Sequence, residues 1–139
     1  SPEAKVRLRP HLTKGNVQQT MKAPATAIIA YDLHFYEKMD KLSLNPNARE
    51  SWMQKTPVEL ERAAFRNASL QGGYFIMAAR SIGLDCGPMG GFDNEGVDKA
   101  FFSGTAIKSN FLCNLGFGDP ALVRPRAGRL DFDEACRIL

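Results

Sequence analysis

The clearest chemical feature of the sequence is the glycine-rich segment GLDCGPMGGFDNEGVDKAFF, which spans residues 83–102. Glycine adopts positive φ angles and lets other groups approach the backbone closely, whereas Pro88 lacks an amide donor and stiffens the chain. The amides of Met89, Gly90 and Gly91 therefore have little side-chain bulk beside them. One interpretation is a helix C-cap followed by a tight turn. The other is a loop that offers backbone hydrogen bonds to a flat or anionic ligand.

A second feature is the pair Arg126 and Arg129, which lies in an irregular segment near the C-terminus. The planar guanidinium group of arginine matches the geometry of phosphate oxygens. A loop of backbone amides and an arginine pair could hold the two ends of a flat, phosphorylated cofactor. Surface arginines beside a turn are the more common explanation of this spacing, so both interpretations stay open.

Other catalytic chemistries find little support in the sequence. Nucleophilic catalysis needs a base beside the nucleophile, but the chain has three scattered cysteines and two remote histidines. Cys86 is interpreted as a small buried hydrophobic residue. The carboxylates of Asp93, Glu95 and Asp98 suit the first turn of a helix better than a calcium loop, which needs a denser series of oxygen ligands. The sequence therefore predicts no catalytic side chain and no metal site.

Composition limits the remaining classes of function. A chain of 139 residues with 44% hydrophobic residues predicts one domain with its own core. The net charge of +3 comes from dispersed basic residues, which argues against nucleic-acid binding. No apolar run approaches the ~20 residues of a membrane span. An odd number of cysteines without metal-site spacing fits the reducing cytoplasm.

The strongest structural signal is the start of a long helix. Thr56 can cap the helix, Pro57 suits its first position, and Glu59 completes a capping box. The pattern predicts a helix that runs to about residue 82 and ends at Gly83. Its many small residues predict that it is buried or packs closely on another helix.

The rest of the chain predicts an α+β domain with the order helix, strand, long helix, helix, strand, helix. We expect a buried strand at residues 23–31 and a second strand at 110–116. Residues 32–56 are expected to be irregular, apart from a turn of helix in HFYEKM at residues 34–39. The remaining predictions are a helix at 2–12 that Pro10 ends early, a short helix at 17–22 capped by Asn16, a helix at 94–102 capped by Asp93, and a final helix capped by Asp131.

Four stretches together resemble the flavin-dependent nitroreductase superfamily, and they extend over nearly the whole chain. They are TMKAPATAIIAYD, AFRNASLQGGYFIMAARSIGLDCGPMGGFDNEGVDKAFF, KSNFLCNLGFGDP and RPRAGRLDFDEACRIL. The subgroup with the greatest resemblance is the malonic semialdehyde reductase (3-hydroxypropionate dehydrogenase) type. The resemblance implies a homodimer with a central sheet flanked by helices, in which the helix from Pro57 forms the interface and FMN binds between the subunits.

The resemblance also implies an activity and a set of contacts. FMN would take electrons from NADH or NADPH and pass them, in ping-pong fashion, to a small carbonyl, nitro or quinone acceptor. The amides of Gly90 and Gly91 would bond the flavin N5 and O4 atoms, with Pro88 and Met89 setting the turn. Many relatives have glutamate where this chain has Gly90, but the contact would come from the backbone.

Further contacts are implied at both ends of the cofactor. Asn16 and Gln19 match positions that face the pyrimidine edge of the flavin. Relatives often have lysine where this chain has Gln19, a departure that bears on the reduction potential. Arg129 matches a phosphate-binding position, with Arg126 as a second donor. Residues 32–56 are expected to cover the flavin face.

One departure concerns the start of the chain. The family pattern places a helix with a phosphate-binding segment, a Pro-Ser loop and a first strand before the position of Ser1, so residues 1–139 are expected to be a single domain that lacks them. Two alternatives follow: a flavin-free fragment that keeps the dimer fold without activity, and a flavin-binding sensor or storage protein. Bound flavin separates the fragment from the other two, and NAD(P)H oxidation separates the enzyme from the sensor.

Overall fold

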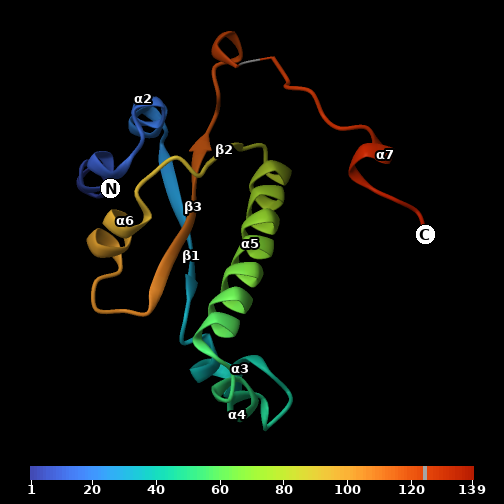
Figure 1. The fold of residues 1–139 in the computed structure, drawn as a ribbon. Helices are drawn as coiled ribbons and strands as arrows, with labels where there is room; N and C mark the ends of the chain where they lie inside the picture. The colour runs from blue at the N-terminus through green and yellow to red at the C-terminus, as the bar shows by residue number, and fades with distance from the viewer. Residues whose placement is uncertain (124) are drawn as a thin grey trace.

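A three-stranded antiparallel sheet forms the centre of the protein in the computed structural model, which describes residues 1–123 and 125–139 (Figure 1). The strands lie in the order β1-β3-β2, so the strand made last stands between the other two. The strands are β1 (Ala25–Asp32), β2 (Asp85–Met89) and β3 (Ile107–Gly116).

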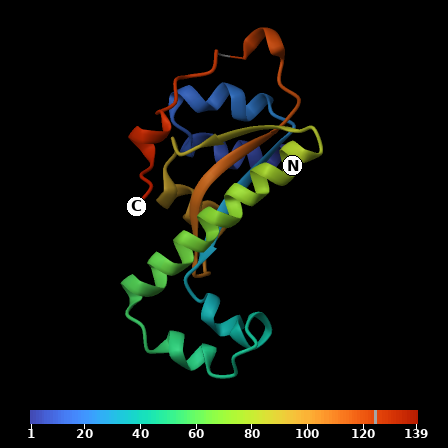
Figure 2. The same cartoon turned by 90° about the vertical axis from the view of Figure 1, so that its right-hand side faces the viewer.

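Helices cover both faces of the sheet, and Figures 1 and 2 show the long helix α5 on one face and α1, α2 and α6 on the other. Small helices α3 and α4 lie at the end of α5 where that helix begins. The α-helices are α1 (Pro2–Leu8), α2 (Lys14–Lys22), α3 (Met39–Leu42), α4 (Ala48–Met53), α5 (Pro57–Ser81), α6 (Asn94–Phe101) and α7 (Phe132–Ala135). Short 3-10 helices occupy Arg9–His11, Phe35–Lys38 and Pro120–Leu122.

The hydrophobic core lies between the sheet and the helices α1 and α6. Val97 of α6 and Leu112 of β3 are completely buried there, and their neighbours are Leu8, Leu12, Met89 and Phe92. On the opposite face, α5 approaches the sheet through its small residues Ala64, Ala68, Gly72 and Ala79. The small residues therefore pack closely, but within one chain their partner is the sheet and not the second helix that was predicted.

The capping signals for α5 and α6 are confirmed. The Thr56 hydroxyl accepts a hydrogen bond from the Glu59 amide at 3.3 Å, and the Thr56 amide donates to the Glu59 carboxylate at 2.9 Å. Gly83 has a φ of 86° directly after α5, a conformation that side chains disfavour. Asp93 caps α6 by accepting from the Gly96 amide at 3.1 Å.

Three predictions about secondary structure were wrong. Residues 85–89 form β2 rather than a loop, because pairing with β3 overrides the low strand propensity of glycine and proline. Asn16 lies inside α2, and Thr13 occupies the N-cap position. Residues 32–56 are less irregular than predicted: the helical turn expected at 34–39 is present, but α4 occupies part of the expected loop.

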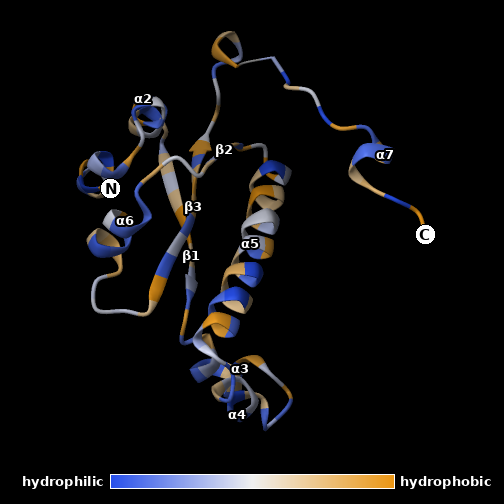
Figure 3. Ribbon diagram, in the orientation of Figure 1, coloured by the Kyte–Doolittle hydropathy of each residue, from blue (hydrophilic) through white to orange (hydrophobic). Residues whose placement is uncertain are grey.

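After β3 the chain leaves the body of the protein as an exposed arm, which we define as residues 119–123 and 125–139 (Figure 1). The arm carries exposed apolar side chains, which Figure 3 shows in orange. They include Leu122, Val123, Leu130, Phe132 and Ile138. Among the residues that the structure describes, no helix is both long enough and apolar enough to cross a membrane.

Asp85 fixes the point from which the arm departs. Its carboxylate accepts a hydrogen bond from the Gly118 amide at 2.8 Å and a second from the Arg80 guanidinium at the end of α5. The Gly118 hydrogen bond, assisted by the charge of Arg80, holds the pKa of the Asp85 carboxyl below its usual range. Because this pKa is lower in the folded state, the stabilisation is present above about pH 4 and is lost as the pH falls through the folded pKa.

We expect the Gly118 amide to report this titration. Its chemical shift in an NMR titration should move with a midpoint below about pH 4, the usual value for aspartate, as the carboxylate is protonated. The Asp85→Asn variant keeps an oxygen acceptor but cannot titrate, so its Gly118 resonance should stay constant over the same range. A wild-type resonance that does not respond to pH would contradict this role for Asp85.

Candidate functional site

The glycine segment lies against the start of α2, and Gly91 makes the contact. The Gly91 carbonyl accepts hydrogen bonds from the Thr13 amide at 3.1 Å, the Thr13 hydroxyl at 2.8 Å and the Asn16 side-chain amide at 2.9 Å. We call this set of Thr13, Asn16 and Gly91 the Gly91 contact. A Cβ atom on Gly91 would lie 2.7 Å from both the Thr13 Oγ1 and the Asn16 Nδ2 atoms. Close approach, and not positive φ, therefore requires glycine here.

Gly90 and Gly91 offer two adjacent backbone donors. Neither N–H has a hydrogen-bond acceptor within the described part of the chain. A Cβ atom on Gly90 would meet nothing within 4 Å, so a side chain such as the glutamate of relatives has room there. These amides can donate to a carbonyl oxygen or a ring nitrogen of a flat ligand, as the flavin contacts predicted for this segment require.

Asn16 and Gln19 are neighbours on α2. The Gln19 side-chain amide donates to the Asn16 side-chain oxygen at 2.8 Å, while the Asn16 nitrogen is bonded to Gly91. The structure therefore brings Asn16, Gln19, Gly90 and Gly91 together from segments about 75 residues apart. Sequence reasoning missed Thr13, although a threonine directly before a helix is a recognisable N-cap signal.

Pro88 and Met89 position the two glycines through the sheet. Pro88 lies opposite Cys113 and Met89 lies opposite Leu112 in the pairing of β2 with β3. The Met89 side chain is 9% exposed, and the Thr20 hydroxyl of α2 contacts its sulfur at 3.5 Å. Pro88 and Met89 therefore form the end of β2, not a free turn, and the strand fixes the position of Gly90.

Arg126 and Arg129 are not brought to this site within one chain. Both lie on the exposed arm, which runs away from α2 and β2 in Figure 1. The Arg129 guanidinium donates only to nearby backbone, the carbonyls of Ala127 at 3.0 Å and Gly128 at 2.9 Å. Residues 32–56, the expected cover, lie beside the start of α5, whereas the glycine segment follows its far end (Figure 1).

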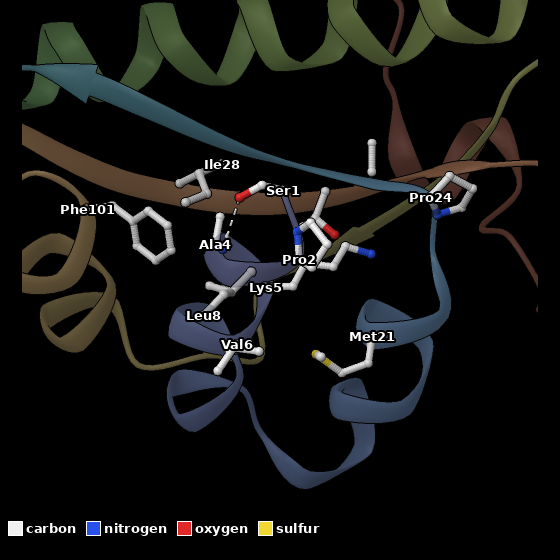
Figure 4. A pocket seen from close by; sticks show the side chains of 12 residues that line it. Ser1, Pro2, Ala4, Lys5, Val6, Leu8, Met21, Pro24, Ile28 and Phe101 are labelled. Carbon is white, nitrogen blue, oxygen red and sulfur yellow. Dashed lines mark hydrogen bonds between the residues drawn. The ribbon is translucent and has the colours of Figure 1, made fainter.

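A cavity of about 500 Å³ lies among α1, α2, β1 and α6 and contains none of the predicted site residues (Figure 4). Its walls include Val6, Leu8, Met21 and Phe101. Its one lysine, Lys5, donates to the backbone carbonyls of Thr20 and Ala23 at the end of α2. The cavity therefore has a largely apolar lining, and the Lys5 ammonium is already bonded to backbone.

A second cavity, of about 540 Å³, lies between β1, the chain at residues 35–42, and α5. The Tyr31 hydroxyl at its edge donates to the Glu61 carboxylate at 3.1 Å, and partial burial, with this bond, raises the pKa of Tyr31 to about 12. Partial burial raises the pKa of Asp32, but the Lys38 ammonium at 2.7 Å and the hydrogen bond from the His34 amide together outweigh it and leave the pKa lowered. No sequence pattern marks Tyr31, Asp32, Lys38 and Glu61 as a group, because each is an ordinary surface residue in isolation.

Comparison with known proteins supplies the family. No family model matches the chain. Curated relatives do, and a candidate NADH dehydrogenase/NAD(P)H nitroreductase from Burkholderia lata is 55% identical over 99% of this chain and 70% of its own length. A protein of the same description from Stenotrophomonas maltophilia is 56% identical, with the same coverage of each chain.

Solved structures share the fold. A candidate NAD(P)H:FMN oxidoreductase from Staphylococcus epidermidis matches with a TM-score of 0.82 at 20% identity, over all of this chain and 72% of its own. A candidate nitroreductase in complex with FMN from Exiguobacterium sibiricum matches with a TM-score of 0.81 at 18% identity, over all of this chain and 73% of its own. These likenesses establish a nitroreductase-like α+β fold, and with the curated relatives they show that the chain belongs to the NAD(P)H nitroreductase family.

Proposed function

We propose that this protein is an FMN-dependent NAD(P)H oxidoreductase in which Gly90 and Gly91 hold the flavin ring. The observation that carries the proposal is the pair of adjacent, unpaired N–H donors beside α2. Their chemistry fits FMN, since the flavin ring presents nitrogen and oxygen acceptors along one edge. When bound, FMN would supply hydride transfer at N5, from NADH or NADPH to a small acceptor.

The chain's own residues bind and orient in this proposal. Pro88 and Met89 set the position of the glycines through the sheet, while Asn16 and Gln19 present polar groups beside them. Arg126 and Arg129 would bind the phosphate of FMN. Because both lie on the exposed arm, the arm must then lie beside a flavin site, either in the same chain or in a partner chain. The described residues would form a single nitroreductase-like domain, and no side-chain nucleophile is required because the redox chemistry belongs to the cofactor.

The acceptor class is a further part of the proposal. We propose a small carbonyl compound of the malonic semialdehyde kind, on the strength of the sequence resemblance, with nitro and quinone compounds as alternatives. The curated relatives carry names that combine NADH dehydrogenase and NAD(P)H nitroreductase. These names support NADH or NADPH as the reductant but do not identify a single electron acceptor. The cytoplasm, where NADH and NADPH are supplied, is the proposed location.

The first test is the visible absorption spectrum of the purified protein before and after addition of FMN. We expect a flavin band that elutes with the protein, and bleaching of that band by NADH or NADPH without oxygen. Reoxidation by malonic semialdehyde, a nitroaromatic and a quinone would then rank the acceptors. No band and no spectral change with excess FMN would favour the flavin-free alternative, and binding without NAD(P)H oxidation would favour a sensor or storage protein.

The proposed assembly is a homodimer through α5. Leu70, Tyr74 and Met77 recur at positions i, i+4 and i+7, which places them on one stripe of the helix. They are 60%, 77% and 68% exposed, an apolar surface that a monomer seldom presents. The exposed apolar residues of the arm would be covered by the same association.

We expect Tyr74→Glu to convert the dimer into a monomer, because it places a charge in the centre of this stripe. Sedimentation velocity of wild type and variant at the same concentration measures the change. Ser103→Glu, which introduces the same charge in the exposed turn after α6, should remain dimeric. A wild-type protein that sediments as a monomer, or a Tyr74→Glu variant that still sediments as a dimer, would exclude α5 as the interface.

A further inference from the structure

Residues 11–13 run antiparallel to residues 91–93 and join the start of α2 to the glycine segment. The Asp93 amide donates to the His11 carbonyl at 2.7 Å, Leu12 forms an isolated bridge with Phe92, and the Thr13 amide donates to the Gly91 carbonyl. Leu12 and Phe92 are both buried in the core. The pairing therefore anchors the segment after Gly90 to a rigid part of the protein.

The Gly91 carbonyl receives more donors than an ordinary backbone carbonyl. It accepts from the amide and hydroxyl of Thr13 and from the side chain of Asn16, at distances of 2.8–3.1 Å. A carbonyl oxygen has two lone pairs, so three donors hold the peptide unit between Gly91 and Phe92 from several directions. Rotation of this unit would break all three bonds together.

The preceding peptide unit is fixed as well. The Phe92 amide donates to the Gly90 carbonyl at 3.1 Å. In a trans peptide the carbonyl and the N–H of one planar unit point in opposite directions, and this chain has no cis peptide in its described residues. With the Gly90 carbonyl held toward Phe92, the Gly91 N–H must point away from that bond, where it has no protein acceptor.

We propose that Thr13 is a positioning residue that orients the Gly91 N–H toward the bound flavin. The inference rests on the proposed function. The Thr13 hydroxyl holds the Gly91 carbonyl, and that peptide unit in turn holds the free donor in place, so Thr13 acts without touching the cofactor. Asn16 shares this role, because its nitrogen is bonded to Gly91 and its oxygen accepts from Gln19.

The test compares Thr13→Val with Thr13→Ser. Valine keeps the shape and the backbone amide of Thr13 but removes the hydroxyl, whereas serine keeps the hydroxyl. We expect the Kd for FMN to be about tenfold higher in Thr13→Val than in wild type, which corresponds to the loss of one hydrogen bond. We also expect a changed flavin reduction potential in Thr13→Val, because a donor at the ring is misaligned. Thr13→Ser should restore both properties to near wild type.

A matched control separates orientation from general loss of stability. Thr26→Val removes a comparable hydroxyl bond, 2.7 Å to the Asn114 oxygen, within the sheet. It should leave the flavin potential unchanged whatever its effect on unfolding. Wild-type affinity and potential in Thr13→Val would overturn the proposal.

A second readout works without flavin. Hydrogen exchange of the Phe92 amide, which is bonded to the Gly90 carbonyl, should be about tenfold faster in Thr13→Val than in wild type, if one hydrogen bond of ordinary strength holds this unit. If wild type binds no FMN, the proposed function fails, and faster exchange in Thr13→Val would show that the Gly91 contact nevertheless orders the segment. Unchanged exchange would remove the positioning role itself.

Discussion

Gly72→Ala is expected to lower the free energy of unfolding by up to about 2 kcal/mol, because overpacking costs about 1–3 kcal/mol and the gain in helix propensity offsets about 1 kcal/mol of it. A Cβ atom at this position would lie 2.5 Å from the ring of Phe111 and 3.3 Å from Ile29. The ring stands between α5 and the sheet, so the added methyl group forces the helix or the ring to move.

The adjacent glycine provides the control. A Cβ atom on Gly73 would meet nothing within 4 Å in the chain, but Gly73 lies on the stripe of α5 proposed as the dimer interface. In the Tyr74→Glu background, where no partner covers this stripe, Gly73→Ala should therefore raise the free energy of unfolding by about 1 kcal/mol through helix propensity. Urea denaturation followed by circular dichroism measures both variants at one protein concentration, because association makes apparent stability depend on concentration. An equal change in both variants, each relative to its own parent protein, would mean that Phe111 yields without cost.

Gly91→Ala is expected to remove most of the flavin binding. The added methyl group would meet the Thr13 hydroxyl and the Asn16 amide at 2.7 Å, and relief of the clash breaks two or more of the hydrogen bonds to the Gly91 carbonyl. At about 1 kcal/mol for each bond, the loss corresponds to roughly a tenfold to hundredfold weaker affinity for FMN. Titration followed by flavin fluorescence measures the change.

Gly90→Ala separates this steric effect from a general requirement for glycine. Open space surrounds the Cβ position of Gly90, and its φ is not positive, so alanine fits without strain. We expect Gly90→Ala to bind FMN within about threefold of wild type, a difference of less than 1 kcal/mol. Equal losses in Gly90→Ala and Gly91→Ala would show that the site needs flexibility at both positions and would contradict the steric explanation.

The elements that the sequence predicted correctly depend on local interactions. Thr56 and Glu59 form a capping box from residues three apart, and Asp131 precedes α7 in the same way, with its amide donating to Glu134 at 3.0 Å. Such signals need no knowledge of the rest of the fold. The helices α5 and α6 were therefore predicted within one or two residues of their observed ends.

The elements that were missed depend on partners far away in the sequence. β2 contains glycine and proline and resembles a turn until β3 supplies its pairing, and its position at the edge of the sheet tolerates Pro88. Asn16 was predicted to cap a helix because asparagine is a common capping residue. Its actual partner, the Gly91 carbonyl, lies 75 residues further on and could not be recognised from the local sequence. Family resemblance thus predicted which residues form the candidate site, but the hydrogen bonds of the Gly91 contact became visible only in the folded structure.

The strand order has a consequence for synthesis of the protein. Among the strands that the structure describes, β3 is made after the other two, and both β1 and β2 pair with it. Ala25 pairs with Leu115, roughly 90 residues later, so at about 5–20 residues per second a ribosome needs roughly 5–20 s to deliver the partner of β1. During this interval α5 can form by itself, while the edge of β1 that pairs with β3 still lacks its partner.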